Sequence, residues 1–160
     1  MPEKETLERA RRDKRQGKSP STQAGEFIRE EIHHIREGKH GARSTKQAIA
    51  IGLSKARRAG VKLGTPKGVS KRTLQSVKSA TAHAGTKPSP ARSRGALKAL
   101  RHEGRSAASH AALSRHATSV ARRRSAADRS RAAQKAVRTK GPAGRKAAAR
   151  KAARTRQRHT

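Results

Sequence analysis

The sequence predicts a mainly α-helical protein: a small helical hairpin or three-helix module with a long basic tail that is largely disordered or forms Ala-rich helix. Three observations lead to this prediction. Leu, Ile, Val and Phe number only 18 among 160 residues, and all five isoleucines lie between Ile28 and Ile51. The formal net charge is +32. Much of the remaining apolar content is alanine, which favours helix but buries little area. A core can therefore form only near the isoleucines.

Residues 1–18 are predicted to be a charged N-terminal helix or arm. Residues 3–16 favour helix, but Leu7 is their only large apolar side chain. A helix with so little apolar surface has nothing to pack, so we expect it to be solvated or frayed. Ser19 and Pro20 then suit the N-cap and the first position of a new helix.

The predicted module, residues 19–84, begins with a helix of about 17 residues. Five apolar residues at spacings of three, one, four and three share one face of it: Ala24, Phe27, Ile28, Ile32 and Ile35. Gly38 suits a left-handed cap at the end of this helix, and Gly41 adds flexibility to the connection that follows.

A second helix is predicted from Ser44, which forms a capping box with Gln47, to a stop at Gly60. Its small residues are spaced by four: Ala48, Gly52 and Ala56. A bulky row on the first helix and a small row on the second predict an antiparallel helical hairpin.

A weaker third helix is predicted from Lys71 to Ala84, with Ser70 as its N-cap. Residues 85–95, GTKPSPARSRG, have the composition of a linker. Residues 96–160 are a basic tail rich in Ala and Arg, whose large apolar residues are too sparse for a core. The sequence GPAG at 141–144 interrupts this tail.

The charge distribution points to a polyanionic partner. Residues 38–160 carry 33 Lys or Arg and 2 acidic side chains. Nucleic acid is the commonest partner for such a chain, and the excess of Arg suits bidentate contacts to phosphate. With one Phe and no Trp or Tyr, the chain lacks platforms for stacking single-stranded bases, which favours duplex DNA.

We therefore expect a non-enzymatic, histone-like DNA-binding protein with little sequence preference, acting through Lys and Arg contacts to phosphate. Its predicted contact residues lie at the end of the second hairpin helix and in the tail: Arg57, Arg58, Lys62, Arg122, Arg123, Arg124, Arg145, Lys146, Arg150, Lys151 and Arg154.

Three alternatives remain open at this level. An RNA-associated or ribosome-associated protein would have the same charge. The nearly neutral hairpin could instead bind a protein partner while the tail tethers it to nucleic acid. A helix-turn-helix that reads bases would use the start of the second hairpin helix, at Arg43, Thr45, Lys46 and Gln47.

The cluster of Glu30, Glu31, His33, His34 and His40 raises the question of a metal site. Each Glu lies three residues before a His, a spacing that can place two ligands together on a helix. The two pairs face different sides, however, and no further acidic residue occurs until Glu103. We therefore expect solvated ion pairs here, with no metal, no cofactor and no catalytic residue.

No stretch approaches 18 apolar residues, and the N-terminus lacks the apolar segment of a signal peptide. The expectation is a cytoplasmic protein at the nucleoid, without a membrane partner. Because the module buries few large side chains for the residues that it orders, homo-oligomerisation through the isoleucine face is a further hypothesis.

The segment SPSTQAGEFIREEIHHIREGKHGARSTKQAIAIGLSKARRAGVKL, residues 19–63, resembles the defining segment of a bacterial family of small basic proteins of unknown function. Some members carry the label plasmid stabilisation protein. The stretches SAASHAALSRHATSVARRRSA and KAVRTKGPAGRKAAARKAARTR resemble the tails of those proteins. The Ala/Lys/Arg-rich end is also similar to bacterial histone H1-like proteins and to alginate regulatory proteins with histone-like tails. The resemblance implies nucleoid binding and no particular functional residue.

Overall fold

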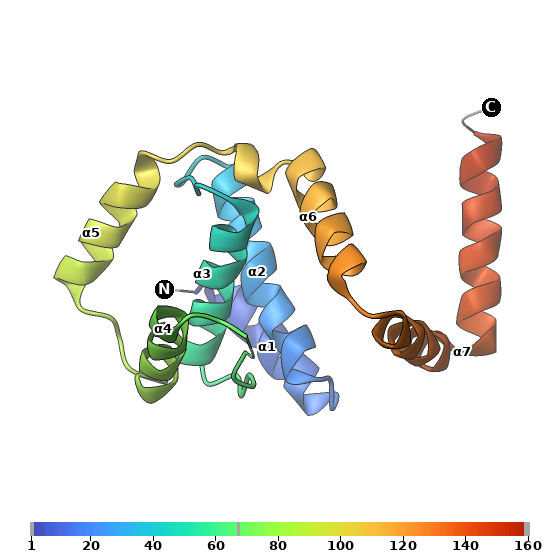
Figure 1. Ribbon diagram of the computed structural model, residues 1–160, viewed down its shortest axis with the longest axis horizontal. Coiled ribbons are helices and arrows are strands. Elements are labelled where there is room, and N and C mark those ends of the chain that lie inside the picture. The colour runs from blue at the N-terminus through green and yellow to red at the C-terminus, as the bar shows by residue number, and fades with distance from the viewer. Residues whose placement is uncertain (1, 67, 159–160) are drawn as a thin grey trace. The chain divides into compact units, whose positions relative to one another are not determined.

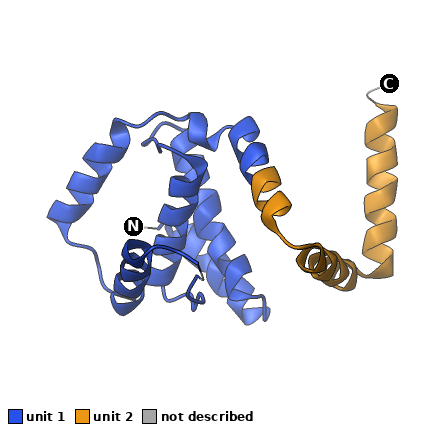
Figure 2. Cartoon of the chain, viewed as in Figure 1, with its two compact units in different colours: residues 1–116 blue, residues 117–160 orange. Residues whose placement is uncertain are grey.

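The computed structural model describes residues 2–66 and 68–158 and is mainly α-helical, with no strand in those residues (Figure 1). The chain divides into two compact units, residues 1–116 and 117–160 (Figure 2). The elements in chain order are α1 (Lys4–Arg15), α2 (Pro20–Arg36), α3 (Thr45–Arg58), α4 (Lys71–Ala82), α5 (Pro90–Arg101), the 3-10 turn η1 (Ser106–Ala108), α6 (His110–Arg123) and α7 (Ala126–Gln157).

The mainly helical fold is confirmed, and the two helices predicted to form a small hairpin, α2 and α3, pack together inside a larger first unit. Helix α2 begins with Pro20 at its first turn, and Gly38 follows its end with φ of 78°. Ser44 caps α3 by accepting a hydrogen bond from the Gln47 amide at 3.2 Å. Gln47 completes a variant of the capping box, since its Oε1 accepts from the Arg43 amide at 2.7 Å rather than from Ser44.

The small row of α3 lies against the bulky row of α2. Ala48, Gly52 and Ala56 are buried, as are Phe27 and Ile35. A Cβ at Gly52 would lie 2.8 Å from the Ile28 Cα, a backbone atom that cannot swing aside. The glycine therefore sets how closely the two helices approach.

We expect Gly52→Ala to destabilise the protein by about 1–3 kcal/mol. The added methyl overpacks the α2–α3 contact, and this cost exceeds the gain in helix propensity from glycine to alanine. Gly25→Ala is the matched control: it also lies inside a helix, but its Cβ would meet open space. That variant should gain about 0.5–1 kcal/mol. Urea unfolding followed by circular dichroism measures both, and equal effects at the two glycines would contradict a close approach at Gly52.

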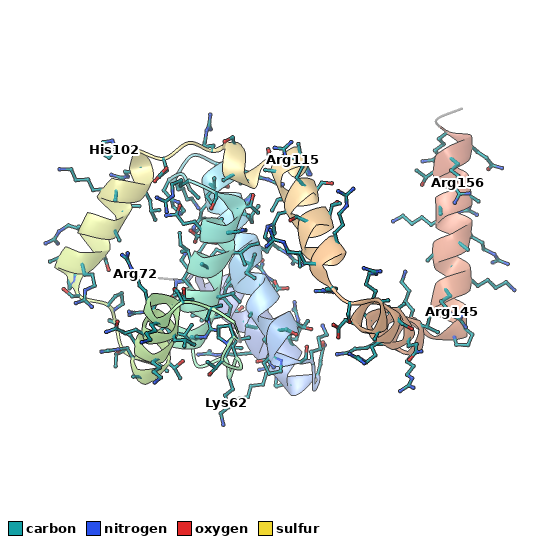
Figure 3. All side chains as sticks on the ribbon, viewed as in Figure 1. Lys62, Arg72, His102, Arg115, Arg145 and Arg156 are labelled. Atoms are coloured by element: carbon teal, nitrogen blue, oxygen red, sulfur yellow. The ribbon has the colours of Figure 1, made fainter. Side chains whose placement is uncertain are left out.

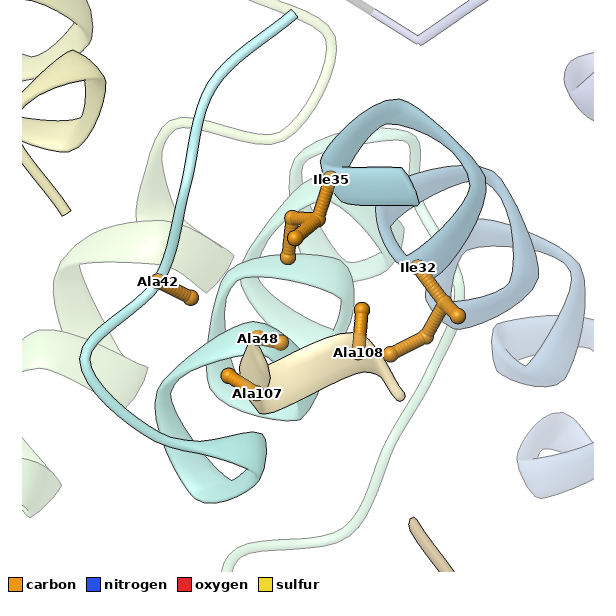
Figure 4. Packing of buried hydrophobic residues seen from close by; sticks show 6 residues of the cluster. All are labelled: Ile32, Ile35, Ala42, Ala48, Ala107 and Ala108. Carbon is orange, nitrogen blue, oxygen red and sulfur yellow. The ribbon is translucent and has the colours of Figure 1, made fainter. Parts of the chain in front are cut away.

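The isoleucine face of α2 is covered from within the chain. Ile32 and Ile35 pack with Ala107 and Ala108 of η1, which return to the hairpin from far along the sequence (Figure 4). The Thr45 hydroxyl donates to the Ala107 carbonyl at 2.7 Å, and just before η1 the Ala42 amide donates to the Gly104 carbonyl at 3.0 Å. The first unit is therefore larger than a hairpin or a three-helix module, and the surface predicted for self-association is occupied.

Helix α1 packs on α2 instead of standing free in solvent. Ala10 joins a second apolar cluster with Ala24 and Phe27, and Arg9 Nε lies 2.8 Å from Glu26 Oε2 across the two helices. The expectation of a solvated or frayed N-terminal helix was wrong, because small side chains and cross-helix ion pairs replace large apolar ones at this contact.

Beyond the hairpin, α4 packs on α3 with Ser70 as its cap, as predicted. The segment predicted to be a linker differs: α5 starts inside it at Pro90, because Ser-Pro serves as a helix start here. Of the two states predicted for the tail, disorder and Ala-rich helix, the structure shows helix. Alanine has the highest helix propensity, and α6 and α7 need no core to be helical. None of the helices in the described parts of the chain has the length and apolar character to cross a bilayer.

Candidate nucleic-acid interface

Helix α7 is built by local signals. Ser125 caps it by accepting from the Asp128 amide at 3.1 Å, and the Ser125 hydroxyl donates back to the Asp128 carboxylate at 2.7 Å. The helix is interrupted at Gly141, which has φ of 64° and is followed by Pro142. The predicted break at GPAG is therefore confirmed, and α7 consists of two helical segments, 126–140 and 142–157.

Each segment carries a row of cations at helical spacing. In the first segment the row is Arg131, Lys135 and Arg138, and in the second it is Lys146, Arg150 and Arg154. All six residues are exposed. Residues three or four apart lie on one helix face, so each row presents one cation about every 5–6 Å along the helix.

The other predicted tail residues are exposed as well. Arg122 and Arg123 lie in the last turn of α6, and Arg124 follows directly. Arg145 and Lys151 project from the second segment of α7, beside its basic row; Figure 3 shows the many basic side chains that extend outward there. None of these side chains packs into a core, because neither α6 nor α7 has a buried residue among those described.

The only acidic residue of the second unit is Asp128, against 15 Lys or Arg. Its hydrogen bonds from Ser125, and then its contact with Arg131 at 2.7 Å, lower the pKa of its carboxyl. It stays ionised at neutral pH and compensates one positive charge near the start of α7. The rest of the helix keeps its positive charge.

In the first unit the acidic residues are largely used internally. Ion pairs among the described residues involve seven of its nine carboxylates: Glu3, Glu5, Asp13, Glu26, Glu30, Glu31 and Glu37. These pairs join α1, α2, α3 and the loop after α2. These seven carboxylates are therefore neutralised by partners within the first unit.

The three contact residues predicted at the end of the second hairpin helix differ in how exposed their side chains are. Lys62 is exposed and Arg58 is half-buried. Arg57 is only 8% exposed, its Nε has no hydrogen-bond partner in the described residues, and its Nη2 lies 3.5 Å from the Gly64 carbonyl. Because the guanidinium turns inward against the loop after α3, Arg57 is not placed to meet a phosphate, which corrects that part of the prediction.

Arg58 has neighbours that the sequence did not indicate. It lines a pocket of about 420 Å³ with Arg11 of α1, Lys55 and Lys87. The Gly85 amide donates to the Arg58 carbonyl at 2.8 Å and so holds the segment with Lys87 against the end of α3. These cations come from three separated parts of the chain, so no local pattern could have grouped them.

Two of the side chains that a helix-turn-helix would use to read bases make hydrogen bonds within the protein. The Thr45 hydroxyl is buried and bonded to Ala107, and the Gln47 side chain is used in the cap of α3. Arg43 and Lys46 remain exposed. Since η1 covers the start of α3, two of the four residues that would read bases serve the fold.

A family model matches residues 4–67. Its description is a family of unknown function, DUF6496. The chain is thus similar to that family over α1, α2, α3 and the loop that follows, a range that includes residues 19–63. The match assigns no activity and no partner. No curated protein and no solved structure matches this chain.

Proposed function

We propose that the protein is a non-enzymatic, histone-like DNA-binding protein that contacts phosphates of the duplex with little sequence preference. The observation that carries the proposal is the exposed cation rows of α7, on a helix that has one acidic residue and no buried side chain among those described. A helix with many like charges and no buried side chain among its described residues gains stability when phosphates neutralise it.

The dimensions of α7 favour duplex DNA over duplex RNA as its partner. The two segments of α7 are about 22 and 24 Å long, and an α-helix with side chains is about 10–12 Å across. That diameter fits the major groove of B-form DNA, about 12 Å wide, whereas the major groove of A-form RNA is deep and narrow. The one aromatic residue among Phe, Tyr and Trp, Phe27, is fully buried, so it offers no platform for single-stranded bases.

Salt dependence tests the mechanism. If six cations of α7 meet phosphates, the affinity for a DNA duplex should fall about a thousandfold between about 50 and 200 mM salt, since each contact contributes about 0.9 to the slope of log K against log salt. Fluorescence anisotropy with two unrelated duplexes measures this, and the two affinities should agree within a few-fold. A flat salt response would contradict the proposal.

The same measurement with a duplex RNA of the same sequence separates DNA from RNA. We expect tighter binding to the DNA duplex at every salt concentration because only its major groove admits a helix. Equal or tighter binding to RNA would favour the RNA-associated alternative.

A further inference from the structure

Three side chains with metal-binding chemistry meet at the end of the first hairpin helix. Glu31 lies within α2 and is fully buried, and His34, one turn later, has a side chain that is 12% exposed. The chain then turns at Gly38, and the loop brings back His40, which is 8% exposed. One ligand atom from each of the three residues lies within 4.8 Å of the others.

The hydrogen bonds of the two histidines fix where their lone pairs lie. His40 Nδ1 is 3.0 Å from the Gly41 carbonyl oxygen, to which it can only donate, so the lone pair of the neutral ring is on Nε2. His34 Nε2 is 2.8 Å from Glu3 Oε1 and donates to that carboxylate, which leaves the lone pair on Nδ1. Histidine ligands of metals make such bonds to a carbonyl or carboxylate through the nitrogen that does not bind the metal.

Neither oxygen of the fully buried Glu31 carboxylate has a hydrogen-bond partner among the described residues. Its Oε2 is 2.7 Å from Lys55 Nζ and its Oε1 is 3.3 Å from His40 Nε2, but neither contact has the geometry of a hydrogen bond. The second contact joins two atoms that both carry lone pairs when His40 is neutral. Two ligands of one tetrahedral zinc ion lie about 3.3–3.4 Å apart, given Zn–N and Zn–O lengths of about 2.0–2.1 Å.

The surrounding charges admit a further cation, although the whole chain is strongly basic. Glu3, Glu30 and Glu31 converge here, against the two ammonium groups of Lys39 and Lys55. Lys55 Nζ pairs with both Glu31 and Glu30, and its distance to Glu30 Oε1 is 3.1 Å. It can thus orient the outer oxygen of Glu31 while the other oxygen faces the histidines.

We propose that Glu31, His34 and His40 bind a divalent transition-metal ion, with zinc the best fit to two imidazoles and one carboxylate. Three protein ligands leave a fourth position for water. The ion would tie the loop after α2 to the helix itself, and Glu3 and the Gly41 carbonyl would act as positioning groups for the two rings. The proposal is independent of nucleic-acid binding, since its residues lie away from the cation rows in the sequence.

Cobalt titration of the full chain tests the site, because tetrahedral Co²⁺ with nitrogen and oxygen ligands absorbs visible light. We expect one Co²⁺ per chain, displaced by one equivalent of Zn²⁺, and a thermal midpoint that rises with Zn²⁺ concentration. Glu31→Gln and His40→Ala should each lower the affinity by a hundredfold or more. His33→Ala is the matched control: this neighbour on α2 has a side chain 67% exposed and pairs with Glu37, so affinity should not change.

Glu3→Gln provides a variant that leaves the buried cluster intact, since the Glu3 side chain is 49% exposed. Removing the negative charge of this partner of His34 should weaken metal binding about 10-fold. Absence of the cobalt absorption in the wild-type chain would overturn the proposal. Equal losses in His33→Ala and His40→Ala would also overturn it, because they would assign binding to surface histidines.

Discussion

Replacing Lys146, Arg150 and Arg154 with glutamine is expected to weaken binding to duplex DNA on the order of a hundredfold at about 100 mM salt. The three exposed side chains form the basic row of the second segment of α7. Losing three phosphate contacts should also lower the salt slope by about 2.7. Glutamine favours helix nearly as well as lysine and arginine do, so circular dichroism should show unchanged helix content.

The matched control makes the same change of charge at the exposed end of another helix. Arg12, Lys14 and Arg15 lie at the end of α1, and all three are exposed. Glutamine at these positions should leave the salt slope within about one contact of the wild type. If both triple variants lose affinity equally, binding follows net charge alone and α7 is not the interface.

Local signals made the central hairpin predictable. The apolar spacing of α2, the cap at Ser44 and the glycines after α2 and α3 each act within a few residues, and the helices begin and end where these signals place them. The small residues Ala48, Gly52 and Ala56 also made it predictable that the two helices pack together. The break in α7 at Gly141 was predictable for the same reason.

The return of the chain to the hairpin was not predictable from local pattern. Ala107 and Ala108 are buried against α2 and α3, yet the tail contains many alanines in similar surroundings that stay exposed. What distinguishes them is a contact with residues about sixty positions earlier. The tail was expected to be largely disordered or to form Ala-rich helix, because low apolar content forbids a core. The structure shows the helix, which alanine favours without a core.

The candidate sites likewise combine features that the sequence shows with features that depend on the tertiary structure. Exposure of the basic residues in α6 and α7 follows from the absence of apolar partners, which composition shows. The inward turn of Arg57, the gathering of Arg11 and Lys87 around Arg58, and the approach of His40 to Glu31 all depend on loops. The sequence allowed comparison only of the faces of α2, which separated the glutamate and histidine pairs. In the structure, the loop after Gly38 brings His40 beside Glu31.

Gly41→Ala is expected to have the largest effect on stability of any alanine substitution in the loop after α2. A Cβ at this position would lie 1.8 Å from the Glu103 carbonyl oxygen and 2.7 Å from that of Gly104. Both are backbone atoms, so the segment after α5 must move away. Two hydrogen bonds would then break: the Gly41 amide to Leu100 at 2.9 Å and the Ala42 amide to Gly104 at 3.0 Å.

The displaced segment leads directly into η1, so the loss spreads to the core. Ala107 and Ala108 would lose their packing against Ile35 and Ala48, and the bond from Arg36 Nε to the Ala108 carbonyl, 2.8 Å long, would weaken. Overpacking against backbone and the loss of buried hydrogen bonds together should cost about 2–5 kcal/mol. Urea unfolding measures the cost, and hydrogen exchange at the Ala42 amide locates it.

Gly104→Ala is the control on the opposite side of this contact. Its Cβ would meet open space, and its φ lies outside the left-handed region. The substitution should change the free energy of unfolding by no more than about 0.5–1 kcal/mol, chiefly through the unfolded chain. If Gly41→Ala were as mild as Gly104→Ala, the segment after α5 would not dock on the loop, and η1 would not cover the isoleucine face of α2.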